Sequence, residues 1–368
     1  MKIAILSSHT PSLFWFRLDM MKLMQERGHQ VVAIGNEPEE QWRDKFLEYN
    51  IEYRRIYVER NGLNPINDFR TFYSILRVLK QIRPEKIFIY QAKTIVYGSI
   101  ASRFAGVREI FLLIAGLGSV FRGRGAKNKI LRFIMIYQYK LASKLSKGIF
   151  IQNNDDRDLF ISYGISKSNK ITMINGSGVN LELFKPTPFP DRPVFLFVGR
   201  LIRDKGIMEY LEASRIIKKS FPNVRCLLVG PFDSNPTALN MNDLNEYLQD
   251  GSVEYFGETS DVKQYLGQCS VFVLPSYHEG TPKSVLEAMA TGRPIITTDA
   301  PGCRETVQEG VNGFLVPVKD SDSLVEKMTL LIEKPDLIPI LGKRSLEICI
   351  KKYDVKKVNQ CINRAMEL

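Results

Sequence analysis

Two carboxylates eight residues apart, Glu279 and Glu287, lie in a stretch that predicts a strand, a loop, a helix and a second strand. The apolar run 271–274 is typical of a buried parallel strand. We expect the helix to begin at Pro282, with Thr281 as its N-cap. Glu279 then belongs to the loop, and Glu287 lies about 7 Å further along the helix axis. The N–H groups at the start of that helix favour an anion between the two carboxylates.

The order of these groups is that of a nucleotide sugar, in which sugar, diphosphate and ribose follow one another. Carboxylates are natural acceptors for the vicinal hydroxyls of both sugar rings. Surface glutamates on an ordinary capped helix are the alternative interpretation. The full stretch, PSYHEGTPKSVLEAMATGRPII, resembles the Glu-x7-Glu motif of the retaining family 4 glycosyltransferases. That resemblance implies that Glu279 orients the transferred sugar at the catalytic centre and that Glu287 holds the ribose. It also implies that Gly280 and Thr281 contact the phosphate or the sugar.

A second cluster, residues 199–206, places Arg200 and Lys205 in a strand–helix turn. Arginine offers a planar fork and lysine a point charge, which together suit a diphosphate; a solvated basic loop is the alternative. The resemblance implies that both residues bind the donor diphosphate and neutralise its charge. It also implies that the backbone near Glu258 holds the nucleobase, although Glu258 could equally be an acid in a solvated loop.

The elements that position these residues predict an α/β fold. Short apolar strands alternate with helices, which indicates parallel sheets, and 368 residues suggest about two domains. The resemblance implies the GT-B fold, two Rossmann-like domains that face a central cleft. We expect an acceptor-binding domain over 1–175, a Gly- and Pro-rich linker over 176–193 and a donor-binding domain over 194–353. The resemblance also implies that a final helix over 354–368 crosses back to the first domain.

Two polar residues of the first domain follow predicted strands. His9 lies in the turn before a helix expected over 14–27, and Lys93 follows the fourth strand, at the carboxyl edge where open α/β sheets bind ligands. His9 could contact substrate and Lys93 a phosphate. A polar loop residue and an ordinary surface lysine are the alternatives.

A glycine-rich loop follows the fifth strand. Gly116 and Gly118 let the backbone approach a ligand closely, and the run resembles the Gly-Leu-Gly loop of bacterial polysaccharide members of the family. Many members carry a histidine before the first of these glycines, where this chain has Ala115. This departure removes the obvious candidate for a catalytic side chain in this domain, and a retaining reaction in which the donor phosphate itself assists the acceptor hydroxyl needs no such base.

Positive charge is concentrated in the first half of the chain. The formal net charge is +11, and residues 1–190 hold 29 Lys and Arg against 16 Asp and Glu. Residues 122–147 predict a basic amphipathic helix, which suits an anionic membrane surface. A crossover helix that packs on the sheet is the alternative, and both can hold because a helix has two faces. Such a patch also suits nucleic acid, which we do not expect as a partner.

Composition also excludes several classes of protein. No apolar run approaches the roughly 20 residues of a membrane span, and the start, MKIAILSSH, predicts a strand rather than a signal peptide. The five cysteines are scattered and odd in number, which favours free thiols in a reducing compartment. The three histidines lack metal-ligand spacing, and Asp320-Ser321-Asp322 predicts a helix N-cap. We expect neither a metal nor a cofactor.

These patterns lead to one hypothesis and two alternatives. The hypothesis is a retaining, metal-independent glycosyltransferase that moves a hexose or N-acetylhexosamine from a UDP-linked sugar to a saccharide on undecaprenyl diphosphate, in bacterial surface-glycan synthesis. We expect it in the cytoplasm, peripheral at the inner face of the plasma membrane. One alternative is a nucleotide-sugar epimerase or glycan phosphorylase of the same fold. The other is a non-catalytic membrane- or nucleic-acid-binding protein.

Overall fold

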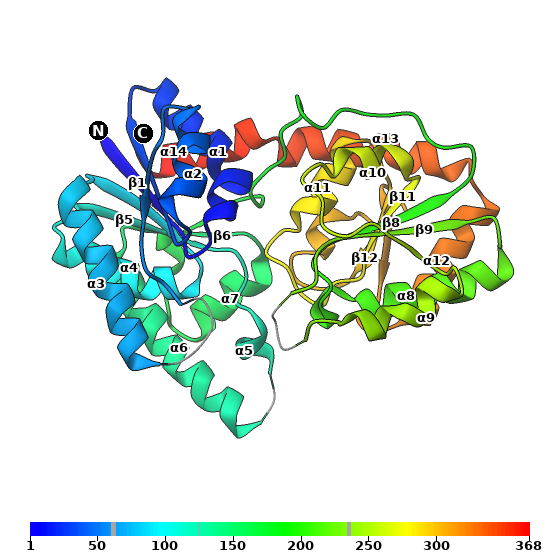
Figure 1. Ribbon diagram of the computed structural model, residues 1–368, viewed down its shortest axis with the longest axis horizontal. Coiled ribbons are helices and arrows are strands. Elements are labelled where there is room, and N and C mark those ends of the chain that lie inside the picture. The colour runs from blue at the N-terminus through cyan, green and yellow to red at the C-terminus, as the bar shows by residue number, and fades with distance from the viewer. Residues whose placement is uncertain (60–63, 124, 234–236) are drawn as a thin grey trace. The chain divides into compact units, whose positions relative to one another are not determined.

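The computed structural model describes residues 1–368 except 60–63, 124 and 234–236, and it divides into two compact units (Figure 1). Unit 1 comprises residues 1–177 and 355–368, and unit 2 comprises residues 178–354. Each unit is built on a sheet in which all paired strands are parallel. The predicted α/β class is therefore confirmed for both units.

The sheet of unit 1 has the strand order β3-β2-β1-β4-β5-β6-β7. Its strands are Lys2–Leu6 (β1), Gln30–Gly35 (β2), Glu52–Arg55 (β3), Lys86–Tyr90 (β4), Glu109–Ile114 (β5), Gly148–Ile151 (β6) and Ile171–Met173 (β7). Its helices are Thr10–Glu26 (α1), Glu39–Leu47 (α2), Pro65–Ile82 (α3), Ala92–Phe104 (α4), Ser119–Arg122 (α5), Ala126–Leu145 (α6), Asn154–Ser162 (α7), the 3-10 turn Ser168–Lys170 (η1) and Val355–Ala365 (α14). One apolar cluster joins the sheet to α3, α4, α6 and α7, and a second joins it to α1, α2 and α14. Both faces are thus covered, as parallel sheets require.

The last helix of the chain, α14, belongs to unit 1. Val358, Ile362 and Met366 are buried in the cluster beneath α1 and α2. The buried ammonium of Lys86 donates to the carbonyl of Met366 at 2.5 Å, and Arg27 donates to the carbonyl of Leu368 at 2.6 Å. Residues from the two ends of the chain therefore share one core.

The sheet of unit 2 has the strand order β10-β9-β8-β11-β12-β13. Its strands are Val194–Val198 (β8), Arg225–Val229 (β9), Glu254–Tyr255 (β10), Val271–Leu274 (β11), Ile295–Thr298 (β12) and Gly313–Val316 (β13). Its helices are Ile207–Ser220 (α8), Met241–Gln249 (α9), Lys263–Gln268 (α10), Lys283–Ala290 (α11), Ser321–Glu333 (α12) and Leu337–Ile348 (α13), with short turns Arg203–Lys205 (η2), Arg304–Thr306 (η3) and Cys349–Tyr353 (η4). Among the described residues, no helix of either unit is long and apolar enough to cross a membrane.

The segment 176–193, expected to be a linker, packs onto unit 2 from Gly178 onward. The N–H of Val179 donates to the carbonyl of Tyr353 at 2.8 Å. The guanidinium of Arg293, which is fully buried, donates to the carbonyls of Thr187 and Pro188 at 2.8 and 3.0 Å. The Gly- and Pro-rich composition indicated a linker. The sequence alone does not show that a buried arginine distant in the chain binds this segment.

Helix α1 begins at Thr10, four residues before the expected start. Pro11 lies in its first turn, where proline costs nothing because the N–H it lacks has no helical acceptor. Helix α2 was not predicted at all. Its buried residues are Trp42 and Phe46 alone, and two apolar positions are too few to give a helical period.

Candidate active site

The carboxyl edge of the unit 2 sheet carries the two most specific sequence motifs. β8 and β11 are neighbours, and the chain leaves them in opposite directions across the sheet, β8 toward β9 and β11 toward β12. Open parallel sheets bind ligands at such a switch point. The basic loop 199–206 follows β8, and the loop 275–282 follows β11. Both motifs therefore flank the switch point.

Two glycines let the backbone of these loops pack closely. Gly206 has a φ of +72°, and a Cβ there would lie 2.0 Å from the carbonyl oxygen of Pro275. Gly302, after β12, has a φ of +80°, and a Cβ there would lie 2.1 Å from the carbonyl oxygen of Glu279. A side chain fits at neither position. The loop that carries Glu279 is thus held against the basic loop on one side and the turn after β12 on the other.

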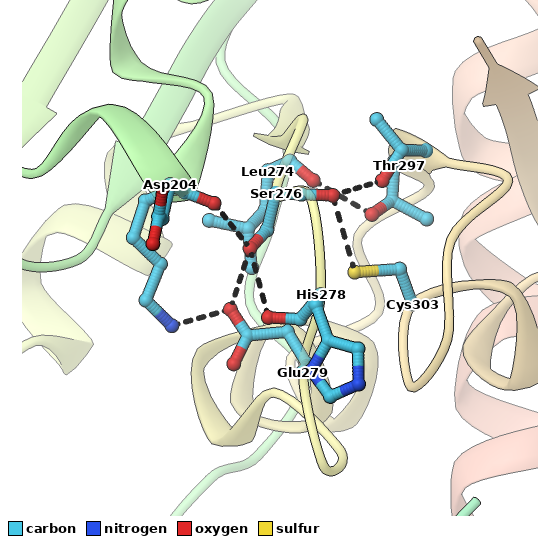
Figure 2. Close-up of polar contacts among 9 residues, drawn as sticks. Asp204, Leu274, Ser276, His278, Glu279, Thr297 and Cys303 are labelled. Atoms are coloured by element: carbon cyan, nitrogen blue, oxygen red, sulfur yellow. Dashed lines mark hydrogen bonds and ion pairs between the residues drawn. The ribbon is translucent and has the colours of Figure 1, made fainter. Parts of the chain in front are cut away.

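The carboxylate of Glu279 is largely buried, with 12% of the side chain exposed, and it forms an ion pair with the ammonium of Lys205. The buried hydroxyl of Ser276 donates to the same carboxylate oxygen at 2.9 Å. Figure 2 shows the carboxylate turned toward Ser276. One carboxylate oxygen is thus held by two donors, one of them charged. The structure thus brings together two residues that the sequence predicted separately, and it adds Ser276, which no sequence pattern singled out.

Buried hydrogen bonds fix the loop behind Glu279. Thr297 donates from its hydroxyl to the carbonyl of Leu274 at 2.6 Å, and Thr298 donates to the carbonyl of Ser276 (Figure 2). The N–H of Tyr277 donates to the carbonyl of Asp204 at 2.9 Å, next to Lys205. β12 and the basic loop therefore both orient the Glu279 loop. Two threonines at the end of β12 were the only sequence signal for this support.

Helix α11 begins at Lys283, one residue later than expected. Pro282 is its N-cap residue with a ψ of 115°, so the prediction of Thr281 as the N-cap was wrong. Proline fixes φ near the helical value but leaves ψ open, and here ψ is extended. Thr281 and Gly280 remain in the loop that precedes the helix, and Glu287 lies within it.

Burial controls the charge of Glu287. Its side chain is 13% exposed, and the ammonium of Lys283 lies 3.9 Å from its Oε1. Burial raises the pKa of Glu287 to about 7, and Lys283 offsets that rise only in part. The carboxyl group therefore titrates near neutral pH. Such a perturbed group near the ligand-binding edge of a sheet is typical of functional sites.

Arg200 and Glu258 lie at the same sheet edge. Neither takes part in the ion pair of Lys205 and Glu279. The side chain of Arg200 is 48% exposed, and its Nη1 lies 2.7 Å from Oδ2 of Asp233. Glu258 is exposed in the loop after β10. Their predicted contacts with the diphosphate and the nucleobase remain predictions.

The predicted residues of unit 1 fall at the carboxyl edge of its sheet. His9 is the N-cap residue of α1, and its N–H donates to the hydroxyl of Ser7 at 3.1 Å. Lys93 lies in the first turn of α4, where its ammonium forms a 2.7 Å ion pair with Asp68 of α3, and its contact with a phosphate stays a prediction. Gly116 and Gly118, in the loop between β5 and α5, have φ values of +121° and +72°.

Comparison with known proteins matches both halves of the chain. A family model described as glycosyl transferases group 1 matches residues 180–346, and one described as glycosyl transferase 4-like matches residues 2–153. The N,N'-diacetylbacillosaminyl-diphospho-undecaprenol alpha-1,3-N-acetylgalactosaminyltransferase of Campylobacter jejuni is 30% identical over 98% of this chain and 96% of its own length. The chain belongs to the group 1 glycosyltransferases. This glycosyltransferase is also 26% identical to the UDP-Gal:alpha-D-GlcNAc-diphosphoundecaprenol alpha-1,3-galactosyltransferase of Escherichia coli, over 80% of this chain and 78% of that relative.

Solved structures share the fold of this glycosyltransferase at lower identity. Anabaena Alr3699/HepE, solved in complex with UDP and glucose, gives a TM-score of 0.80 at 19% identity and covers 100% of this chain and 99% of its own. Sucrose-phosphate synthase from Thermosynechococcus elongatus gives a TM-score of 0.82 at 19% identity, over 100% and 98% of the two chains. The expected GT-B class is confirmed.

Proposed function

We propose that this glycosyltransferase moves a hexose or N-acetylhexosamine from a UDP-linked sugar to a saccharide carried on undecaprenyl diphosphate. Its product is a precursor of a bacterial surface glycan. The names of the Campylobacter and Escherichia relatives support this proposal, because both specify acceptors on a diphosphoundecaprenol and the second specifies a UDP donor. A 26% identical relative in Staphylococcus aureus is a capsular polysaccharide biosynthesis glycosyltransferase. These transferases give no support to the epimerase, phosphorylase or binding-protein alternatives.

The observation that carries the proposal is the ion pair of Lys205 and Glu279 at the switch point. A cation and a carboxylate in contact suit the junction of a nucleotide sugar, where the diphosphate meets the transferred sugar. Lys205 and Arg200 stabilise the leaving diphosphate as charge develops on it. Glu279 accepts hydrogen bonds from hydroxyls of the sugar, and Glu287 accepts them from the ribose when it is ionised.

Retention and independence of metal ions are also part of the proposal. Retention accords with Ala115, whose methyl group cannot act as a base, so that the donor phosphate takes the proton of the acceptor hydroxyl. The two cations Arg200 and Lys205 supply the charge that a metal ion would otherwise provide. Asp320 is occupied as the N-cap of α12, where it accepts from the N–H of Ser323 at 2.9 Å. We expect EDTA to leave the rate unchanged and NMR of the product to show the donor's anomeric configuration; an inverted product would refute retention.

Helix α6 supports a further part of the proposal, binding to an anionic membrane surface. The predicted helix 122–147 is divided into α5 and α6, and Arg124 between them lies outside the described residues. Tyr139 and Ala142 of α6 pack on the sheet. The opposite face exposes large apolar side chains at helical spacing, namely Ile130, Phe133, Ile134, Tyr137 and Leu141. Exposed Lys129 and Lys144 belong to the same helix. An exposed apolar stripe with flanking lysines suits the headgroup region of an anionic bilayer.

Flotation with liposomes that contain anionic lipid tests this binding. We expect the double variant Phe133→Ser, Ile134→Ser and the double variant Lys129→Glu, Lys144→Glu each to lose most of the floated fraction. The matched control is Lys334→Glu with Lys343→Glu, which makes the same charge change at exposed positions of unit 2. An equal loss of the floated fraction in the control would mean that net charge, and not helix α6, determines binding. No loss in either α6 variant would refute a membrane role for this helix.

A thermal-shift panel with UDP, GDP and ADP tests the donor. A ligand at 100 times its dissociation constant stabilises the protein by about 2.7 kcal/mol, which for domains of this size is a rise in Tm of about 5–10 °C. We expect that rise with UDP, and a much smaller one for the Lys205→Ala variant. A shift with GDP or ADP instead would reassign the donor, and no shift with any nucleotide would refute the proposed function.

A further inference from the structure

A polar cluster lies at the switch point of the unit 1 sheet. β1 and β4 are neighbours, and the chain leaves them in opposite directions, β1 toward β2 and β4 toward β5. Ser7 and Ser8 directly follow β1, and Gln91 directly follows β4. The rule that locates the donor at the edge of unit 2 therefore points to these residues in unit 1. The mechanism described above uses neither Ser8 nor Gln91.

The backbone of Gln91 is in a conformation that almost only glycine adopts. Its φ is +72° and its ψ is 141°, whereas Arg83, the C-cap residue of α3, has a φ of +48° and a ψ of 59° in the ordinary left-handed region. A non-glycine residue stays in such a conformation only where its surroundings fix it, and such residues cluster at functional sites. Glycine would adopt this backbone conformation at lower cost. The presence of a glutamine side chain at position 91 therefore requires an explanation.

The side chain of Gln91 binds the two serines across the switch point. Its Oε1 accepts from the hydroxyl of Ser7 at 2.9 Å and from that of Ser8 at 2.6 Å. A hydroxyl has one proton and two lone pairs. Since Ser8 commits its proton to Gln91, its oxygen can act toward a ligand only as an acceptor. The partner that this oxygen suits is a donor such as a sugar hydroxyl.

A buried cation lies close to this cluster. Arg17 of α1 is 2% exposed, its Cζ lies 5.3 Å from the ring centroid of Tyr90, and Tyr90 is hydrogen-bonded to Ser12. Within the described part of the chain, Nε and Nη1 of Arg17 have no hydrogen-bond partner. Burial lowers the pKa of Arg17 to about 10, so it stays charged at neutral pH. Its positive potential disfavours a cationic ligand and favours one that is rich in oxygen.

We propose that Ser8 accepts a hydrogen bond from a hydroxyl of the acceptor saccharide, and that Gln91 is the positioning residue that holds Ser8 for this contact. The inference rests on the proposed function, because it assigns a subsite for the saccharide that the enzyme extends. It explains why a strained glutamine occupies a position where glycine would fit.

Steady-state kinetics with an undecaprenyl-diphosphate-linked saccharide and a UDP-sugar test this assignment. The variants are Ser8→Ala and Gln91→Gly, and the matched control is Arg83→Gly, which also removes a side chain from a residue with positive φ, in the turn before β4. We expect both test variants to raise the KM for the acceptor about fivefold or more, the scale of one lost hydrogen bond. The KM for the donor and the thermal shift with UDP should change less than twofold, and Arg83→Gly should behave as wild type.

Thermal unfolding of the same variants separates positioning from folding. Because glycine relieves the strained backbone, we expect the Tm of Gln91→Gly to equal or exceed that of wild type while the KM for the acceptor rises. A fall in Tm accompanied by equal rises in both KM values would overturn the inference in favour of a structural role. An unchanged acceptor KM in Ser8→Ala would overturn it directly. If wild type transfers to no lipid-linked saccharide, the proposed function itself is refuted, and this subsite assignment is refuted with it.

Discussion

Titration of Glu287 should make donor binding depend on pH near neutrality. In the proposed function, Glu287 accepts hydrogen bonds from the ribose in its ionised form, and burial raises the pKa of this carboxyl group to about 7. With that value, the ionised fraction falls about tenfold between pH 8 and pH 6. We therefore expect the affinity for a UDP-sugar to fall about tenfold over this interval. An exposed glutamate of ordinary pKa would give almost no change.

Calorimetry with UDP-glucose or UDP-N-acetylgalactosamine measures this effect. The diphosphate of a UDP-sugar is a diester with no proton to lose between pH 6 and pH 8, so the ligand does not contribute to the pH dependence. Binding at pH 7 in buffers of different ionisation enthalpy should release about half a proton. The variant Glu287→Gln should bind more weakly at pH 8, with an affinity that no longer changes with pH. Equal wild-type affinity at pH 6 and pH 8 would refute the reasoning.

Stability of the protein without ligand should show the opposite trend. The folded-state pKa of Glu287 lies above the ordinary value of 4.5, so its contribution to stability is fully present below about pH 4.5 and is lost as the pH rises through about 7. The loss amounts to about 3 kcal/mol at full ionisation. Glu287→Gln should therefore raise Tm at pH 8 by several degrees, up to about 10 °C, and have little effect at pH 5. A lower Tm at pH 8 would contradict burial as the cause of the raised pKa.

Two further substitutions test how the loops are held. Replacing Arg293 with Met should destabilise unit 2 by about 3 kcal/mol or more in a denaturant titration, because the buried carbonyls of Leu266 and Thr291 lose their donor. No change would mean that the proline-rich segment is held by its apolar contacts. Gly206→Ala should lower Tm far more than Gly251→Ala: both glycines have φ near +70°, but only the first Cβ would meet a backbone atom, the carbonyl oxygen of Pro275. Equal losses would show that the backbone conformation, and not the contact, requires glycine at 206.

Features set by local composition were predictable from the sequence. The apolar run of β11 and the Gly-containing turn after it identified the Glu279 loop, and the alternation of strands and helices identified parallel sheets. Helix α2 was missed since its period rests on two side chains. The start of α11 was misplaced because a proline is compatible with both the N-cap and the first helical position.

Contacts between distant residues were not predictable in the same way. Lys93 has the position of a ligand-binding cation, yet Asp68 neutralises it, and no local pattern links two residues of different helices. The pairing of Lys205 with Glu279 likewise depends on the register of β8 beside β11. The sequence allowed helix α6 both a face on the sheet and an exposed face, and only the structure shows which of its apolar residues belong to each.

The position of α14 bears on the order in which the protein is made. Unit 1 has most of its residues in the first half of the chain, but its core also needs Val358, Ile362 and Met366. A ribosome that adds roughly 5–20 residues per second takes about 10–35 s to synthesise residues 178–354. Throughout that interval the nascent first unit lacks part of its core and presents apolar surface. The whole sequence of unit 2 is synthesised before that of unit 1, so unit 2 can complete its fold first. Chaperones then have a defined time window in which to bind the incomplete unit 1.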